Sequence, residues 1–278
     1  ASRRLLRAHQ AEVVIGMGGF TSLPPVYAGR KLGLLTCVHD SNALPGKANR
    51  LTARWCDKIL LGLEAARPYF SERAGSVVVT GTPVRTEMSQ LPDRPVAAAG
   101  FELDPETPTV FVYGGSQGGQ GLNSLVMEAS RELGAGTQWI HVAGRTDFER
   151  VRKEMAGQEH HKVLGFCSDM PAGYAASDLV LCRAGASSLT ELAFLGKPAI
   201  LVPFPYSADD HQTVNAEAFE SPGAAILAQQ ADLDGGKLAG IVSGLLGDPA
   251  RLAGMGEAMR AMSVDDSAAQ IADVLEGR

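Results

Sequence analysis

The chain has 278 residues, of which 45% are hydrophobic and 20% charged, a composition typical of a globular protein with one large or two modest domains. No apolar run reaches the roughly 18–20 residues that span a bilayer, and no secretory signal opens the chain. The net charge of −6 hides an asymmetry: residues 1–60 carry nine Lys and Arg against three acidic residues, so the remainder carries −12. An acidic body with a basic N-terminal region disfavours nucleic-acid binding and favours attraction to an anionic membrane or a phosphorylated substrate.

The sequence lacks the motifs of several common classes of enzyme and metal-binding protein. The chain has no GxSxG elbow, HExxH motif, Walker A loop or CxxC pair, which argues against a serine hydrolase, a zinc peptidase, a P-loop ATPase and a zinc module. The four cysteines stand singly in apolar or helical surroundings, which favours buried free thiols over disulfides or metal ligands and suits a reducing cytoplasm. They are Cys37, Cys56, Cys167 and Cys182.

Short apolar or β-branched runs alternate with helical stretches along most of the chain. The first series predicts strands at 12–17, 34–39, 58–63 and 76–80, with helices at 23–31 and 46–56. The second predicts strands at 109–114, 138–143, 162–166, 178–182, 198–203 and 224–228. Its helices are expected at 119–133, 147–156, 169–176, 188–195, 209–220, 235–246, 249–263 and 266–276. Such alternation, with nearly continuous apolar strands, indicates parallel sheets covered on both faces.

The division into domains follows from this pattern. The stretch 91–108 holds four prolines and is interpreted as a linker. It separates a partial N-terminal domain (1–90), whose four strands resemble half a domain, from a complete six-stranded C-terminal domain (109–262). The last residues, 263–278, are expected to form a helix that packs back on the N-terminal domain.

Three turns after strands of the second series suggest ligand contacts. In 114–119 (GGSQGG) glycines let backbone N–H groups approach an anion at a helix N-terminus, and Ser116 offers a hydroxyl to a phosphate. The run is not a GxGxxG fingerprint and no acidic residue follows about 20 positions on, so NAD is disfavoured. The alternative is simply a tight, glycine-rich turn.

The turn 183–191 (RAGASSLTE) offers small residues where open α/β sheets bind ligands, and Glu191 suits the two hydroxyls of a ribose. The same residues read as a capping box from Ser188 to Glu191, and the local pattern favours that role. After the next strand, Gln212 is suited to sugar hydroxyls, whereas Asp209 and Asp210 also fit a helix N-terminus.

In the first series, His39 and Asp40 close a strand and suggest acid–base chemistry, although a histidine satisfied at a strand end is an equal alternative. Arg85 follows the last strand and is suited to a phosphate, but a surface or linker arginine fits the spacing equally well.

Taken in order, these segments resemble the MurG family of bacterial glycosyltransferases from about residue 11 to the final helices. The motifs are GMGGF, HDSN-x(2)-PGKANR, GTPVR, GGSQG-x(3)-LN, CRAGASSLTELAFLGKPAILVPFP and DDHQ-x(2)-NA. Members transfer N-acetylglucosamine (GlcNAc) from UDP-GlcNAc to lipid I, an undecaprenyl-pyrophosphoryl muramyl pentapeptide, and so make lipid II for peptidoglycan. The resemblance implies an inverting GT-B-type enzyme with two Rossmann-like, doubly wound domains, and neither a cofactor nor a bound metal.

Carried over by motif, the resemblance implies contacts for individual residues. Ser116 would contact the diphosphate, Arg85 would lie beside the donor, and the backbone at Cys167 would meet uracil. Gln212 and Asn42 would touch GlcNAc, and Glu191 would bind the ribose hydroxyls with capping as a second task. The residues expected to wrap phosphate and ribose are Ala186, Ser187, Ser188, Leu189, Thr190 and Glu191.

One departure from the family pattern affects catalysis. The GGTGGH-type loop, whose histidine is the favoured base in the family, is absent together with roughly the first quarter of a full-length member, so the N-terminal domain is expected to be incomplete. His39 is the candidate stand-in. The alternatives are a donor-binding fragment or half of a split transferase, inactive alone, and another UDP-sugar enzyme of GT-B type such as an epimerase.

The resemblance also implies partners and a location. Members act as peripheral proteins at the cytoplasmic face of the plasma membrane, where UDP-GlcNAc and lipid I meet, and cell-wall synthesis proteins are further candidate partners. The basic region offers the contact with anionic lipid. It comprises a helix at 46–56 with Lys47, Arg50, Leu51, Arg54 and Trp55, preceded by Arg3, Arg4 and Arg7.

Overall fold

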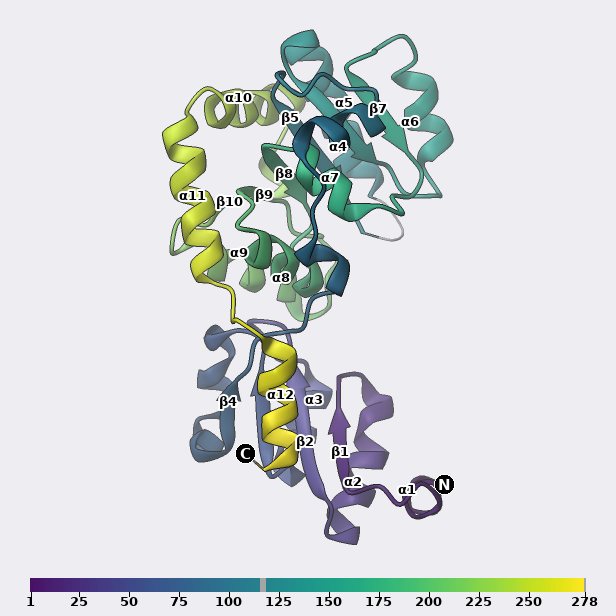
Figure 1. The fold of residues 1–278 in the computed structure, drawn as a ribbon, viewed down its shortest axis with the longest axis vertical. Coiled ribbons are helices and arrows are strands. Elements are labelled where there is room, and N and C mark those ends of the chain that lie inside the picture. The colour runs from purple at the N-terminus through teal and green to yellow at the C-terminus, as the bar shows by residue number, and fades with distance from the viewer. Residues whose placement is uncertain (116–118, 278) are drawn as a thin grey trace. The chain divides into compact units, whose positions relative to one another are not determined.

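The computed structural model describes residues 1–115 and 119–277, which divide into two compact units (Figure 1). The first unit comprises Ala1–Pro83 and the segment that begins at Ser263, and the second comprises Val84–Met262. Each unit contains a β-sheet in which every described strand pair is parallel. The prediction of two parallel-sheet α/β domains is confirmed.

The first unit holds, within the described residues, a four-stranded sheet in the order β1-β2-β3-β4. Its strands are β1 (Val13–Gly16), β2 (Leu35–Asp40), β3 (Lys58–Leu61) and β4 (Val77–Val79). Its α-helices are α1 (Ser2–Ala8), α2 (Leu23–Leu32), α3 (Lys47–Thr52) and α12 (Ser267–Glu276). Its 3-10 helices are η1 (Phe20–Ser22), η2 (Ala53–Trp55) and η3 (Glu64–Ser76).

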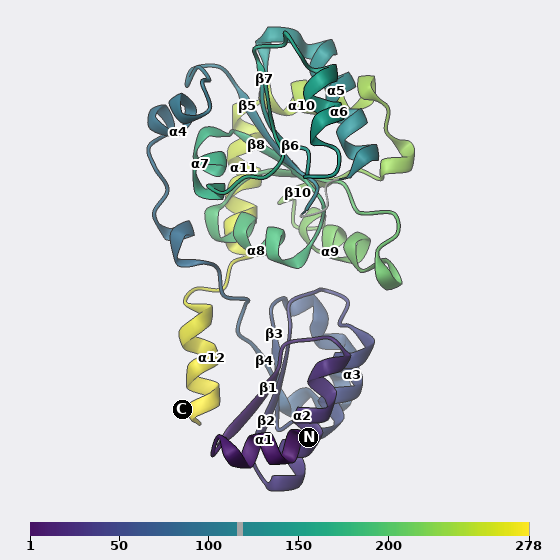
Figure 2. The ribbon, with the colours of Figure 1, turned by 90° about the vertical axis from the view of Figure 1, so that its right-hand side faces the viewer.

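Helices cover both faces of this sheet, which is why its strands are apolar without strict alternation. Figures 1 and 2 show α12 on one face and α2 with α3 on the other. Gly29 lets α2 approach β1, because a Cβ there would lie 2.8 Å from Val14. Gly81 does the same for the C-terminal segment: it adopts φ +70°, and a Cβ would lie 2.3 Å from Ser267 Oγ.

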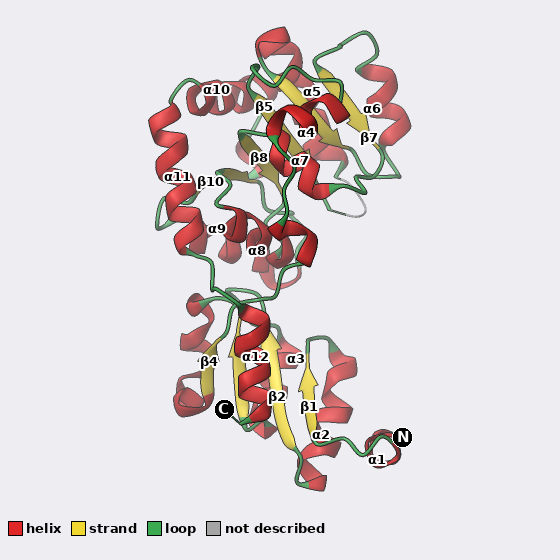
Figure 3. Ribbon diagram, viewed as in Figure 1, coloured by secondary structure: helices red, strands yellow, loops and turns green. Residues whose placement is uncertain are grey.

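The second unit holds a six-stranded sheet within the described residues, in the order β10-β9-β8-β5-β6-β7 (Figure 3, strands in yellow). Its strands are β5 (Thr109–Tyr113), β6 (Gln138–Val142), β7 (His161–Leu164), β8 (Leu179–Cys182), β9 (Ala199–Leu201) and β10 (Ala225–Leu227). Its α-helices are α4 (Arg94–Gly100), α5 (Gln120–Leu133), α6 (Phe148–Glu154), α7 (Met170–Ala176), α8 (Ala186–Leu195), α9 (His211–Glu220), α10 (Gly235–Leu246) and α11 (Pro249–Ala261). Its 3-10 helices are η4 (Thr86–Ser89), η5 (Gly134–Gly136), η6 (Ala208–Asp210) and η7 (Gln230–Asp232).

Strand β5 lies at the centre of this unit and is buried along its whole length. Val110 and Val112 belong to the core that also contains the apolar faces of α5 and α10. Phe111 points to the opposite face, where a Cβ on Gly173 of α7 would lie 2.6 Å from its ring. Figure 2 shows α5 and α10 on one face of the sheet and α4 with α7 on the other, the doubly wound arrangement.

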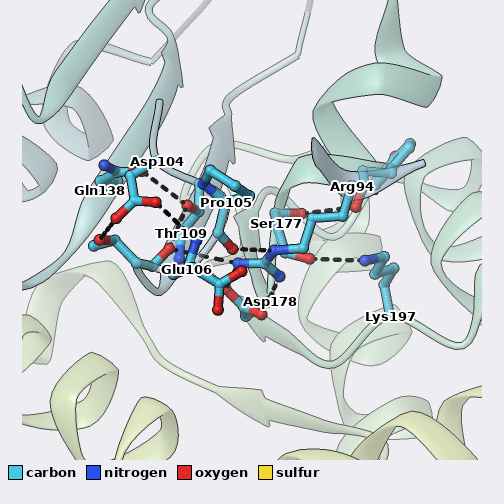
Figure 4. Close-up of polar contacts among 11 residues, drawn as sticks. Arg94, Asp104, Pro105, Glu106, Thr109, Gln138, Ser177, Asp178 and Lys197 are labelled. Carbon is cyan, nitrogen blue, oxygen red and sulfur yellow. Dashed lines mark hydrogen bonds and ion pairs between the residues drawn. The ribbon is translucent and has the colours of Figure 1, made fainter. Parts of the chain in front are cut away.

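The segment 91–108, expected to be a linker, lies within the second unit and contains α4. The Arg94 guanidinium makes two hydrogen bonds to the Asp178 carboxylate, whose Oδ2 also accepts from Thr109 N–H at 2.8 Å (Figure 4). Arg94 Nε donates to Pro105 O at 2.8 Å. These contacts fasten both ends of the segment to the edge of the sheet where β8 and β5 begin. The local sequence gave no sign of them, because Arg94 and Asp178 are 84 residues apart.

A buried polar chain ties the first turn of α5 to β6 and β7. Asn123 Nδ2 donates to Asp147 Oδ2 at 2.8 Å, so its Oδ1 accepts from His141 Nε2 at 3.0 Å. His141 Nδ1 then accepts from His161 Nε2 at 3.0 Å, and His161 Nδ1 accepts from the Ser130 hydroxyl at 2.7 Å. Both rings are neutral in this arrangement. Burial lowers the pKa of His141 to about 3 and of His161 to about 2.

These two histidines predict acid sensitivity of the second unit. Between pH 6.5 and about 3, His141 and His161 are protonated in the unfolded chain but stay neutral in the folded one. The free energy of unfolding therefore falls as the pH falls. The slope is at most about 1.4 kcal/mol per pH unit for each histidine. We expect His161→Gln to remove close to half of the histidine contribution to this slope. Urea titrations followed by Trp139 fluorescence, in a Trp55→Phe background, measure it.

His9→Gln serves as the control for this experiment, because His9 is exposed in the first unit. Its slope should equal that of the parent. An unchanged slope in His161→Gln would contradict the assignment of a neutral, buried ring.

Candidate functional site

The strand order of the second unit reverses at β5. From β5 the chain continues through β6 to β7 on one side, then returns to β8 on the other side of β5 and continues to β9 and β10. At such a reversal the loops after the two central strands diverge, and open α/β sheets bind ligands there, outside the carboxyl ends of the strands. The described residues that follow these strands are 114–115 and Gly119 after β5, and 183–185 after β8.

Both loops lead directly into a helix whose cap residue is glycine. Gly119 precedes α5 and Gly185 precedes α8, so neither helix has a side chain at its cap position that can satisfy the first backbone N–H groups. Gly115 adopts φ +91°, a conformation that favours glycine. N–H groups presented in this way bind anions, helped by the helix dipole. Ser116, the predicted diphosphate contact, lies outside the described residues.

Arg183 provides a buried cation beside these helix starts. Only 6% of the residue is exposed, and one terminal nitrogen donates to Val202 O and Pro203 O at 3.1 and 2.9 Å. The other terminal nitrogen donates to Gln230 Oε1 at 2.6 Å, and a Cβ on Gly119 would lie 3.1 Å from it.

The charge of Arg183 is incompletely compensated. Among the described residues no carboxylate pairs with the guanidinium, and its buried Nε has no hydrogen-bond partner. Burial lowers the pKa to about 10, so the side chain stays charged at neutral pH. A buried, partly unsatisfied cation next to two helix N-termini is suited to an anionic ligand.

Glu191 does not cap its helix, so the capping-box interpretation is wrong. Helix α8 begins at Ala186, two residues before Ser188, and the glutamate lies in its second turn. One carboxylate oxygen, Oε2, accepts from the Tyr174 hydroxyl at 2.8 Å, and Oε1 pairs with Arg85 at 3.1 Å. The side chain is 16% exposed. The carboxylate is thus held away from the helix start and keeps part of its surface open.

The residues between the helix start and Glu191 serve different purposes. Leu189 is buried in the core, and the Thr190 hydroxyl donates to Ala186 O at 2.8 Å. Ser187 is exposed and Ser188 half-buried. That the first turns of α8 wrap a ligand stays a prediction, to which the exposed Ser187 and the backbone N–H groups are best suited.

Gln212 and Cys167 lie at the same edge of the sheet, beyond β9 and β7. Gln212 Oε1 accepts from Phe204 N–H at 2.9 Å, which fixes the loop after β9. The residues before it, Asp209 and Asp210, have φ of 50° and 54°, a strained conformation for non-glycine residues and one that clusters at functional sites. Cys167 is buried and its thiol donates to Asp169 O at 3.2 Å. Sugar contact by Gln212 and uracil contact at Cys167 stay predictions.

In the first unit Asp40 accepts hydrogen bonds from Asn42 and Asn49, whereas the His39 ring contacts Gly81. Asn42 donates to Asp40 Oδ1 through its backbone N–H at 2.9 Å and its amide at 3.2 Å, while Asn49 donates to Oδ2 at 2.8 Å. His39 is 1% exposed, and its Nε2 contacts Gly81 O at 2.9 Å, so that nitrogen carries the proton. Burial lowers the pKa of this ring. A general-base role for His39 stays a prediction, and this geometry argues against it.

Sequence reasoning missed Arg183 and Tyr174 as functional candidates. Arg183 had one signal: a charged residue directly after a buried apolar strand, at the edge where ligands bind. Tyr174 had no signal in the sequence, because its hydroxyl contacts Glu191 only when α7 and α8 are packed together. Among the described residues, no helix is long and apolar enough to cross a membrane. Nor, in the same residues, do three or more His, Cys, Asp or Glu gather to hold a metal ion.

Two family models match the chain. The glycosyltransferase family 28 C-terminal domain matches residues 109–271, and the corresponding N-terminal domain matches residues 1–61. A relative in Chlorobium luteolum is 38% identical over 275 residues, covering 99% of this chain and 73% of that protein. It is named UDP-N-acetylglucosamine--N-acetylmuramyl-(pentapeptide) pyrophosphoryl-undecaprenol N-acetylglucosamine transferase.

Solved structures agree with this assignment. The MurG of Acinetobacter baumannii superposes with a TM-score of 0.83 at 26% identity, covering 100% of this chain and 78% of that one. A UDP-GlcNAc 2-epimerase from Neisseria meningitidis has a TM-score of 0.72 at 12% identity, over 99% of this chain and 79% of that one, and shares the fold alone. The GT-B-type fold inferred from sequence is confirmed. The chain belongs to the MurG group of glycosyltransferase family 28.

Proposed function

We propose that this chain transfers GlcNAc from UDP-GlcNAc to lipid I and forms lipid II for peptidoglycan synthesis, with the donor held by the second unit. One observation carries the donor site: at the reversal point of the sheet, two uncapped helix starts lie next to the buried cation of Arg183. The name of the Chlorobium luteolum relative supports the reaction.

The diphosphate of the donor fits this group of positive charges. N–H groups at the starts of α5 and α8 donate to phosphate oxygens, and Arg183 adds a charge that the described protein residues leave without a carboxylate. UDP carries additional negative charge when the bond to the sugar breaks. Fixed dipoles and cations that are already in place stabilise that charge without reorganisation, which lowers the barrier to transfer.

The nucleoside and the sugar are assigned to residues on the same edge. Glu191 accepts hydrogen bonds from the ribose hydroxyls, and the backbone at Cys167 contacts uracil. Gln212 contacts GlcNAc, and the contact of Asn42 with GlcNAc, implied by the family motif, stays a prediction. Arg85, now paired with Glu191 at 3.1 Å, lies beside the donor. The half-exposed Arg85 side chain has freedom to turn toward a phosphate.

Transfer also requires a base for the acceptor hydroxyl, and inversion proceeds by direct attack without a covalent enzyme intermediate. His39 is poorly suited to this task, since its ring is buried and only 1% exposed. This observation favours a second candidate function, a UDP-sugar-binding module without transfer activity. Formation of labelled lipid II from labelled UDP-GlcNAc and lipid I by the purified chain supports the enzyme. Donor binding without product supports the module.

We further propose that the first unit contacts anionic lipid at the cytoplasmic face of the plasma membrane. A pocket of about 460 Å³ is lined by Lys47, Arg50, Arg54 and Arg73, together with Tyr69. At its rim Leu51 and Tyr69 are 39% and 43% exposed. Basic side chains around exposed apolar ones are typical of peripheral membrane contact.

Glu191→Ala tests the donor site. Loss of a charged acceptor for the ribose hydroxyls should weaken UDP-GlcNAc binding about tenfold to a hundredfold and raise the donor KM in the transfer assay. Isothermal titration measures the affinity. Glu257→Ala, which removes an exposed carboxylate on α11, is the control and should bind as the parent does. Equal binding by Glu191→Ala would remove Glu191 from the site.

Arg183→Gln tests the diphosphate contact. We expect UDP affinity to fall about tenfold or more, because a charge-assisted contact is lost, while uridine affinity changes less than about threefold. Retained uridine binding shows that the variant is folded. The diphosphate assignment is refuted by a variant that loses UDP and uridine affinity in equal proportion, or that loses neither.

Vesicle sedimentation at low salt tests the lipid contact. The parent should sediment with vesicles that contain an anionic phospholipid and should not sediment with neutral vesicles. Arg50→Glu should weaken binding about tenfold, since each basic residue near the surface contributes about 1 kcal/mol. Arg251→Glu, a charge reversal at an exposed position of the second unit, should weaken it less. The same binding to neutral and anionic vesicles would refute the proposal.

A further inference from the structure

Tyr174 donates the 2.8 Å hydrogen bond that fixes one oxygen of the Glu191 carboxylate. The other oxygen pairs with Arg85, whose side chain is 53% exposed. The two partners therefore differ in rigidity: Tyr174 is 0% exposed, whereas an exposed arginine is held weakly in place. The orientation of the carboxylate depends mainly on the tyrosine.

The packing of α7 explains why the Tyr174 hydroxyl is in the right place. Asp169 caps the helix by accepting from Ala172 N–H at 3.0 Å. Gly173 allows the helix to press against the sheet at Phe111, whose ring meets the Tyr174 ring edge-on at 5.4 Å. An aromatic ring clamped in this way has little rotational freedom, so its hydroxyl occupies one position.

A second tyrosine completes the chain of hydrogen bonds. Tyr174 donates its proton to the carboxylate, so its oxygen accepts from the Tyr113 hydroxyl at 2.8 Å. Tyr113 is the last residue of β5 and immediately precedes the Gly114–Gly115 turn. Burial raises the pKa of both tyrosines well above its usual value, so both remain donors at any physiological pH.

We propose that Tyr174, itself held by Tyr113, is a positioning residue that orients Glu191 for recognition of the ribose hydroxyls. The inference rests on the proposed donor site and adds to it the element that makes ribose selection effective. A carboxylate whose orientation is fixed in advance binds two neighbouring hydroxyls more tightly, because less conformational freedom is lost on binding.

Without the Tyr174 hydroxyl, the chemistry around Glu191 changes in a defined way. Oε2 loses its protein donor, and the carboxylate is free to turn toward Arg85, its remaining partner. Affinity for the ribose hydroxyls should fall, whereas contacts to uracil and diphosphate, which do not involve Glu191, should persist. A purely structural tyrosine would instead affect every part of the nucleotide equally.

The experiment compares dissociation constants for UDP and 2′,3′-dideoxy-UDP, measured by isothermal titration on the full chain. Their ratio isolates the contribution of the ribose hydroxyls. We expect a large ratio for the parent, a ratio near one for Glu191→Gln, and a ratio about fivefold to tenfold below the parent for Tyr174→Phe. Tyr113→Phe should give an intermediate ratio. Tyr27→Phe, which removes an exposed hydroxyl in the first unit, is the matched control.

Each result has one meaning. A parent ratio near one would show that the hydroxyls are not recognised, and both the donor-site assignment of Glu191 and this inference would fall. A large parent ratio that Tyr174→Phe leaves unchanged would overturn this inference alone. If Tyr174→Phe does not fold, the Tyr113→Phe variant tests the inference instead. This variant keeps the hydrogen bond from Tyr174 to Glu191 and removes only the hydrogen bond from Tyr113 that holds Tyr174. If the ratio of dissociation constants for Tyr113→Phe equals that of the parent, the inference is overturned.

Discussion

The reversal of strand order at β5 is the constraint on which the rest of the second unit depends. Because β6 and β8 flank β5 on opposite sides, the helices that follow β5 and β8 start at the same edge. Every feature of the candidate donor site, including the glycine caps, Arg183 and Glu191, lies at that edge. The same central strand carries Phe111 and Tyr113, which position α7. One strand thus organises the core and the site together.

The site is assembled from groups that a purely stabilising design would avoid. A buried arginine without a carboxylate partner costs free energy, and Glu191 is paired on one side with an arginine that is half exposed. Two consecutive aspartates adopt left-handed backbone before Gln212. By contrast, the Arg94–Asp178 pair, at the opposite edge of the sheet, is fully engaged in hydrogen bonds. The unpartnered Nε of Arg183 therefore lies at the edge where a charged ligand is expected.

Much of the fold was predictable because its signals are local. Continuous apolar runs marked the ten described strands, and small residues marked the turns at their carboxyl ends. Helix α4 was missed because its anchor, Asp178, is 84 residues away in sequence. The capping box at Ser188 was a false local signal, since α8 gains two more residues from the Gly185 turn. The roles of Tyr174 and Tyr113, 61 residues apart, follow from packing alone, and so does the burial of His39.

The most direct test of the donor site is a crystal structure of the chain with UDP. The diphosphate should lie between the starts of α5 and α8 within hydrogen-bond distance of Arg183, and the ribose hydroxyls should donate to Glu191. Nucleotide bound at any other place, with the edge between β5 and β8 empty, would contradict the assignment of this edge as the donor site.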